Sequence, residues 1–173
     1  MKKVLFVIAP SDFRDEELFE TKKALEKVGV VDSELASTKK GEAVGMLGRR
    51  TNVDLLVSQV KLANYSAVVF VGGKGVESHR LAENPDVLKL AREAYASGKV
   101  VGAICIAPRI LASAGIVNGK KVTSFPDSKT KELLKNAGSY YTGASVERDG
   151  KIITADGPNS ATIFGEKIAQ ALS

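Results

Sequence analysis

The sequence is short of the residues that build metal sites and disulfide frameworks. Among its 173 residues there is one cysteine, Cys105, and one histidine, His79. A single cysteine excludes an internal disulfide, and no cluster of ligand residues supports a metal site. No apolar run approaches the roughly 18 residues of a membrane-spanning helix. We therefore expect a soluble, cytoplasmic protein that has no membrane segment and binds no metal.

The sequence also lacks the signatures of proteins that bind nucleic acid and of proteins that bind a dinucleotide. The net charge is +5, but basic and acidic residues alternate along helix-like segments such as residues 20–29, as on solvated helix faces. Without a recognised binding module or an aromatic stacking platform, nucleic acid is not an expected partner. The glycine fingerprint of a dinucleotide site is missing after the first apolar run, where residues 9–17 read APSDFRDEE. No organic cofactor is expected.

What the sequence does contain is a regular alternation of strand and helix patterns. Buried strands are predicted at residues 2–9, 31–37, 66–73 and 100–105, and hairpins within residues 39–60 and 145–157, the second turning at Asp149 and Gly150. Helices are predicted at residues 16–29, 84–99, 107–115, 127–138 and 160–172. This alternation predicts an α/β fold, a doubly wound, mostly parallel sheet with helices on both faces. We expect one domain over residues 1–173.

Cys105 stands where a predicted buried strand passes directly into a predicted helix. Ligands of open α/β sheets bind beyond the carboxyl ends of the strands, and a sharp strand-to-helix turn lifts its central side chain above the sheet. This abrupt passage predicts a strained turn at Cys105. The N-terminus of the next helix favours a thiolate, which predicts a lowered pKa for Cys105. The alternative is a small buried apolar residue, and position alone leaves both interpretations open.

Two further stretches favour a site near this cysteine. Gly72 and Gly73 end the preceding buried strand, where glycine lets backbone N–H groups approach a ligand, although a plain tight turn is the alternative. A group of acidic residues that includes Glu17 follows the first strand. Such residues complement the dipole of a helix, or one of them supplies a carboxyl group to the site.

Together these stretches resemble the ThiJ/PfpI superfamily, which includes the Parkinsonism-associated deglycase and PfpI-type intracellular peptidases. The resemblance covers nearly the whole chain and rests on residues 12–18, 68–73, 98–127 and 153–158, which read DFRDEEL, VVFVGG, GKVVGAICIAPRILASAGIVNGKKVTSFPD and ITADGP. It implies a flavodoxin-like fold and a homodimer. It also implies a reactive cysteine at Cys105, a protonated carboxyl at Glu17 that donates to the thiolate, and oxyanion-type backbone donors at Gly73 and Ile106.

The chain departs from this family where histidines are expected. Ile106 stands where peptidase-like members carry histidine, Phe125 where many deglycase-like members do, and Asp156 where arginine or histidine is frequent. Gly72, His79 and Asp156 are further candidate pocket residues. His79 either enters the site from a loop or is an exposed residue ahead of a helix, so no Cys–His pair is assured.

These residues predict an enzyme whose chemistry needs a thiolate and one acid. We predict a cysteine-dependent glyoxalase or deglycase, acting on a small aldehyde substrate of the α-oxoaldehyde class or on a glycated protein, with Glu17 moving protons. One alternative is a redox-responsive sensor or holding chaperone that uses the oxidation of Cys105. The other is a PfpI-type intracellular cysteine peptidase, which here lacks its usual histidine.

Overall fold

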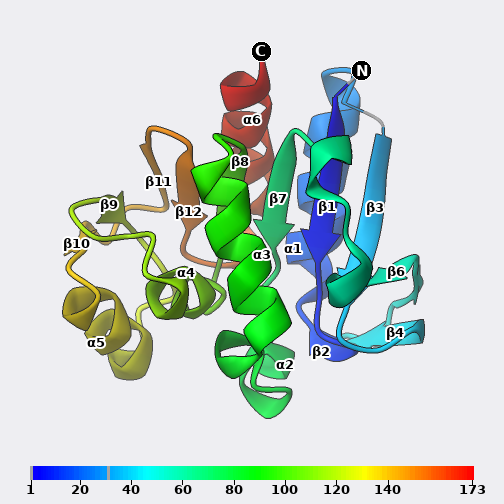
Figure 1. Cartoon of the computed structure of the whole chain (residues 1–173), viewed down its shortest axis with the longest axis horizontal. Coiled ribbons are helices and arrows are strands. Elements are labelled where there is room, and N and C mark those ends of the chain that lie inside the picture. The colour runs from blue at the N-terminus through cyan, green and yellow to red at the C-terminus, as the bar shows by residue number, and fades with distance from the viewer. Residues whose placement is uncertain (1, 31) are drawn as a thin grey trace.

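The centre of the molecule is a seven-stranded sheet. The computed structural model describes residues 2–30 and 32–173. The strand order is β11-β12-β8-β7-β1-β3-β6, and every neighbouring pair is parallel except β11 with β12 (Figure 1). These strands are β1 (Lys3–Val7), β3 (Asp32–Ser37), β6 (Leu55–Leu56), β7 (Ala67–Phe70), β8 (Val100–Ile104), β11 (Val146–Asp149) and β12 (Ile152–Ala155). The predicted fold class, a doubly wound and mostly parallel α/β sheet, is confirmed.

Helices cover both faces of this sheet. α1 (Asp15–Lys27) and α6 (Ala161–Leu172) pack together on one face, and α3 (Pro85–Ala96) and α4 (Pro108–Ala114) lie on the other (Figure 1). α2 (Lys74–Ser78) follows β7 at the carboxyl end of the sheet, and α5 (Ser128–Asn136) packs against α4. Within the described residues, no helix combines the length and the apolar character needed to cross a membrane.

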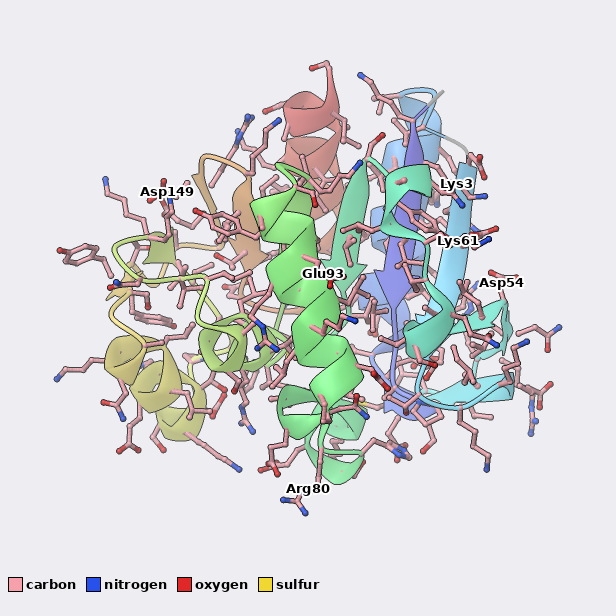
Figure 2. The ribbon with its side chains drawn as sticks, in the orientation of Figure 1. Lys3, Asp54, Lys61, Arg80, Glu93 and Asp149 are labelled. Carbon is pink, nitrogen blue, oxygen red and sulfur yellow. The ribbon has the colours of Figure 1, made fainter. Side chains whose placement is uncertain are left out.

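The continuous apolar runs of the strands are explained by two cores. Side chains of a strand alternate between the faces of a sheet. In β1, Val4 and Phe6 therefore join the core under α1 and α6, while Leu5 and Val7 join the core under α3 and α4. Most charged side chains are directed outward, as Lys61, Arg80 and Glu93 illustrate (Figure 2).

Two small sheets complete the fold, and they differ partly from the sequence prediction. The predicted hairpin within residues 39–60 is the antiparallel pair β4 (Gly41–Gly45) and β5 (Arg50–Val53), which the unpredicted strand β2 (Ser11–Phe13) extends. β9 (Lys121–Val122) pairs with β10 (Tyr140–Tyr141), and neither was predicted. Strands of two or three residues are too short to show a period in the sequence.

One predicted turn is shifted by one residue, and two predicted boundaries fall outside the described residues. The turn of the β11–β12 hairpin lies one residue later than predicted, at Gly150 and Lys151, because Asp149 still pairs with Ile152. Gly150 has φ +61°, which a glycine adopts without steric cost. The strand predicted from residue 31 begins at Val31, which lies outside the described residues, as does Met1 of the predicted domain.

Candidate active site

Cys105 occupies a strained turn between β8 and α4. Its φ is +64°, in the left-handed region that residues other than glycine rarely adopt, so the predicted strained turn is confirmed. The turn is tied on both sides. The N–H of Cys105 donates to the carbonyl of Ala155 at 3.0 Å, and its own carbonyl accepts from the N–H of Phe125 at 2.8 Å. These bonds hold the thiol at the carboxyl end of the sheet.

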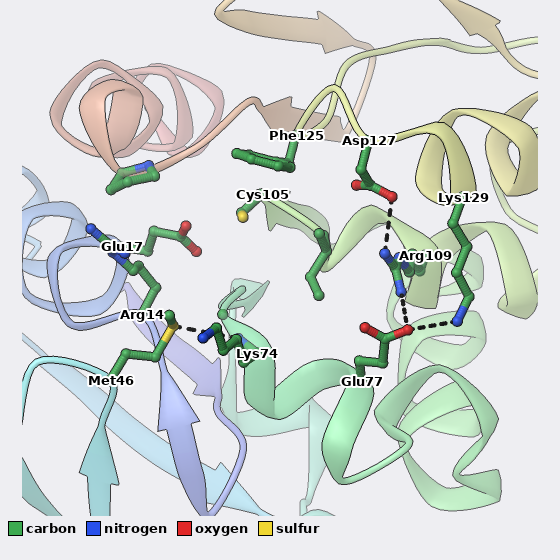
Figure 3. A pocket seen from close by; sticks show the side chains of 13 residues that line it. Arg14, Glu17, Met46, Lys74, Glu77, Cys105, Arg109, Phe125, Asp127 and Lys129 are labelled. Atoms are coloured by element: carbon green, nitrogen blue, oxygen red, sulfur yellow. Dashed lines mark hydrogen bonds and ion pairs between the residues drawn. The ribbon is translucent and has the colours of Figure 1, made fainter.

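The carboxyl group of Glu17 lies beside this thiol. Glu17 is in the first turn of α1 and is completely buried. Its Oε2 accepts from the N–H of Gly72 at 2.8 Å. Its Oε1 has no nitrogen or oxygen donor among the described residues, and the carboxyl group is directed toward the Cys105 sulfur (Figure 3). The structure thus brings the predicted acid and the predicted thiol together.

The end of β7 passes so close to this pair that a side chain is excluded. A Cβ atom on Gly72 would lie 2.6 Å from the Cβ of Cys105 and 2.6 Å from Oε2 of Glu17. Gly73 has φ +110°, and its N–H and that of Ile106 donate to the Cys105 sulfur. Gly72, Gly73 and Ile106 therefore surround the thiol with their backbone, as the glycine pair suggested.

Burial controls the ionisation of the two groups. Desolvation raises the pKa of Glu17 to about 8, and the bonds from Gly72 and Cys105 lower it by less. Burial also raises the pKa of the Cys105 thiol, the charge of Glu17 raises it further, and the donors at Gly73 and Ile106 oppose both. The predicted lowering of the Cys105 pKa is therefore wrong, because burial outweighs the field of the nearby helix.

The carboxyl and the thiol act as one titrating pair. Since each charge is disfavoured by burial and by the other, the pair keeps both protons near neutral pH and loses the first one at higher pH. The single negative charge is then shared. Two N–H groups stabilise it on the sulfur, and the Gly72 N–H stabilises it on the carboxylate.

A pocket of about 560 Å³ opens above the sulfur. Four apolar side chains, those of Met46, Ile106, Phe125 and Pro158, form part of its lining. Phe125 is the most prominent of these, because its ring lies close to Cys105 in Figure 3 and is 45% exposed. The Cys105 side chain is partly exposed, so the pocket gives solutes access to the thiol.

Another part of the lining is a network of charged side chains, drawn on the right of Figure 3, and Arg14 and Lys74 add two further charges near Met46. Arg109, only 6% exposed, donates to Thr130 Oγ1 at 2.7 Å and to Asp127 Oδ1 at 3.0 Å, and lies 3.4 Å from Glu77 (Figure 3). Lys129 also contacts Glu77, at 2.7 Å. Arg109 was not among the predicted site residues. The available signal was a charged residue within the otherwise apolar helix pattern of residues 107–115.

The turn that carries Met46 is fixed to α1 by Asp15. This carboxylate is 2% exposed and accepts from the N–H groups of Leu47 at 2.8 Å and Arg49 at 2.9 Å. The N–H of Met46 donates to the carbonyl of Phe13 at 2.9 Å. A buried carboxylate that satisfies two backbone donors thereby sets one wall of the pocket.

None of the three candidate pocket residues lines the pocket: Gly72 lies behind it, with its N–H bonded to Glu17, and the other two side chains are directed elsewhere. His79 ends α2 as an exposed residue, with its Nε2 2.7 Å from Ser11 Oγ. Asp156 accepts from Ser160 Oγ at 2.6 Å. Neither side chain lines the pocket, because α2 carries His79 to the surface and Asp156 turns toward the chain segment ahead of α6.

A resident metal ion finds no ligand set in the part of the chain that the structure describes. No group of three or more histidine, cysteine, aspartate or glutamate side chains there has the arrangement of a metal site. The chemistry of the site therefore has to be derived from the thiol, the carboxyl group and the backbone donors.

Comparison with known proteins shows which proteins the whole chain is similar to. Residues 2–171 match the family model described as the DJ-1/PfpI family. An uncharacterized protein of Methanocaldococcus jannaschii is 45% identical over 98% of this chain and 82% of its own. A Pyrococcus horikoshii protein named a deglycase is 35% identical over 90% of each chain. The crystal structure of a ThiJ/PfpI domain protein from Brachyspira murdochii superimposes with a TM-score of 0.92 at 34% identity, covering 98% of this chain and 95% of that one.

Proposed function

The chain belongs to the DJ-1/PfpI family, and from this premise we propose that it is a cysteine-dependent enzyme of the glyoxalase or deglycase type. Its substrates are α-oxoaldehydes or the adducts that they form on proteins. One observation carries the proposal: the Cys105 sulfur lies at a pocket, beside the buried Glu17 carboxyl and in contact with two backbone N–H donors. Relatives named deglycases support the same reaction class.

The first step is addition of the thiolate to the aldehyde carbon. A carbon–sulfur bond forms, and the electron pair of the carbonyl moves onto oxygen. The N–H groups of Gly73 and Ile106 stabilise the negative charge at this position, as donors of an oxyanion hole do. Protonated Glu17 then transfers its proton to the oxygen and yields a neutral hemithioacetal.

The second step moves a hydrogen between neighbouring carbons. The Glu17 carboxylate removes the proton from the carbon bonded to sulfur, and the electron pair forms a carbon–carbon double bond while the neighbouring carbonyl oxygen takes up the charge. The hydroxyl proton of the sulfur-bearing carbon passes to that oxygen. Glu17 then returns its proton to the adjacent carbon, which becomes the carbinol, and the sulfur-bearing carbon becomes the carbonyl. The product is a thioester of a 2-hydroxy acid. Water hydrolyses it, releasing the 2-hydroxy acid and regenerating the thiol. The net reaction adds one water to the α-oxoaldehyde and consumes no oxidant or reductant.

The ionisation of the pair gives this reaction a pH dependence. The nucleophile requires that the Glu17–Cys105 pair has lost its first proton, and the raised pKa of Glu17, about 8, puts that loss on the alkaline side of neutrality. Activity and the alkylation of Cys105 by iodoacetamide should therefore rise together between pH 6 and pH 9.

The experiment is turnover of methylglyoxal by the purified chain without glutathione. Lactate should form, Cys105→Ala should abolish its formation, and Glu17→Gln should lower kcat by a factor of about 100 or more, since it removes the proton shuttle. His79→Ala is the matched control and should leave turnover unchanged, because His79 is exposed outside the pocket. If folded wild-type protein with an unmodified Cys105 forms no lactate, the proposal is rejected.

Two other outcomes separate the alternatives. Peptide cleavage that depends on Cys105 would favour a peptidase, although the pocket lining contains no histidine to act as base or acid. If no aldehyde is turned over but peroxide readily converts Cys105 to the sulfinate, the redox-sensor function is favoured instead.

A further inference from the structure

The most exposed aromatic side chain at the site stands next to the nucleophile. Phe125 keeps 45% of its surface exposed, although a ring of this size gains free energy when water is removed from it. The hydrogen bond from its N–H to the Cys105 carbonyl, at 2.8 Å, holds the backbone of Phe125 beside that of Cys105. The ring and the sulfur line the same pocket (Figure 3).

Three further apolar side chains line the same pocket around the sulfur. Ile106 follows the nucleophile directly, Pro158 begins the turn that leads into α6, and Met46 is carried by the β4–β5 turn. All of them are partly exposed within the pocket. Together with Phe125 they form what we call the apolar wall, defined by Met46, Ile106, Phe125 and Pro158.

The charged side of the pocket does not compete for the same part of a ligand. Arg109 is bonded to Asp127 and lies against Glu77, and Lys129 also pairs with Glu77. These charges satisfy one another. Of the two other cations in the lining, Arg14 is bonded to Glu16 and Lys74 is exposed to water. The side chains of the apolar wall remain exposed or partly exposed among the described residues. A methyl group would leave most of a 560 Å³ pocket, and most of that wall, in contact with water.

We propose that this pocket selects α-oxoaldehydes that carry a bulky apolar substituent, above all an aromatic ring, over methylglyoxal. The inference rests on the proposed function and specifies its substrate class. Once the aldehyde carbon is bonded to sulfur, the substituent packs on the apolar wall, with its ring against Phe125. Specificity then arises from apolar surface removed from water rather than from a hydrogen bond to the substituent.

The test compares phenylglyoxal with methylglyoxal on the full chain. Each kcat/KM is divided by the rate constant of the same aldehyde with a small free thiol, which corrects for intrinsic reactivity. The corrected ratio should favour phenylglyoxal by at least about tenfold, the lower end of the discrimination that one methylene gives in an apolar pocket. Phe125→Ala should lower this ratio by about tenfold, and Phe125→Leu by less.

Tyr140→Ala is the matched control. Tyr140 is 67% exposed on β10 and lies outside the pocket lining, so its replacement should leave the ratio unchanged. A corrected ratio near one, or a ratio that Phe125→Ala does not change, would overturn the inference while methylglyoxal turnover still supports the proposed function.

A second measurement decides the inference if no aldehyde is turned over, in which case the proposed function fails. Acetophenone has the aromatic ring but no aldehyde, and acetone has neither. Protection of Cys105 from iodoacetamide by acetophenone but not by acetone, weakened in Phe125→Ala, would support an aryl-binding pocket. Equal effects of the two ketones would reject it.

Discussion

Replacing Glu17 by glutamine should change the way in which the stability of the protein depends on pH. Glutamine keeps the shape of the side chain and can still accept from the Gly72 N–H, but it carries no ionisable proton. In the wild type the folded-state pKa of Glu17 lies above its ordinary value, because the carboxyl group is buried. Folding therefore takes up a proton between pH 4.5 and about 8, and the free energy of unfolding falls as the pH rises through this range.

The size of the effect follows from that interval. One pKa unit corresponds to about 1.4 kcal/mol, so the whole interval corresponds to roughly 5 kcal/mol, of which about 3 kcal/mol is already lost at pH 7. Below pH 4.5 the folded and the unfolded chain both hold the proton, and the contribution of Glu17 is fully present. Glu17→Gln lacks this loss. Between pH 4.5 and about 8, its free energy of unfolding relative to that of the wild type should therefore increase by about 1.4 kcal/mol per pH unit.

Urea denaturation at pH 5, 6, 7 and 8 measures this difference directly. The two curves should diverge with rising pH, and the divergence should level off above about pH 8. Glu26→Gln, at an exposed position near the end of α1, is the control and should give a difference that does not depend on pH. A constant difference between Glu17→Gln and wild type would mean that Glu17 is ionised in the folded protein, and the reasoning about the pair would fail.

Three further substitutions probe the surroundings of the pair. Gly72→Ala should abolish turnover and cost roughly 3 kcal/mol of stability in thermal unfolding, since its Cβ would overlap Cys105; a stable, active variant would contradict the geometry. Asp15→Ala should lower stability by about 2 kcal/mol, because two backbone donors lose their acceptor, and should raise KM. An unchanged KM would show that these two hydrogen bonds, which we call the Asp15 clamp, do not shape the pocket. Arg109→Met should cost about 2 kcal/mol in urea denaturation, because Asp127 loses its buried partner, and an unaffected midpoint would show that the network is dispensable.

The sequence predicted the fold well where the strands and helices are long enough to show a continuous apolar run or a regular period. The strands are buried on both faces, so apolar runs such as that of β8 mark them clearly, and the helices between them carry a strong 3.6-residue period. The strained turn at Cys105 was predictable because strand and helix follow each other with no intervening loop. Strands β2, β9 and β10 were not predictable, because runs of two or three residues are too short to show a period in the sequence.

The site was less predictable than the fold, for an electrostatic reason. The residues around Cys105 suggested a thiol acidified by a helix terminus. The pKa of that thiol is raised first by its own burial and then by the charge of Glu17, 88 positions away in the chain, and only the folded structure shows either cause. Likewise, the position of His79 depended on the direction in which α2 leaves the sheet.

The Asp15 clamp has a consequence for how a ligand enters the pocket. Asp15 and Glu17 lie on the same turn of α1, so the loop that carries Met46 and the carboxyl group that handles the proton belong to one mechanical body. That body is held against α6, where Gly165 allows the two helices to touch. Any displacement that widened the Met46 side would also pull Glu17 from the sulfur. The pocket is already open beside the exposed Phe125 and the partly exposed Cys105, so a substrate that reaches the thiol there leaves this body undisturbed.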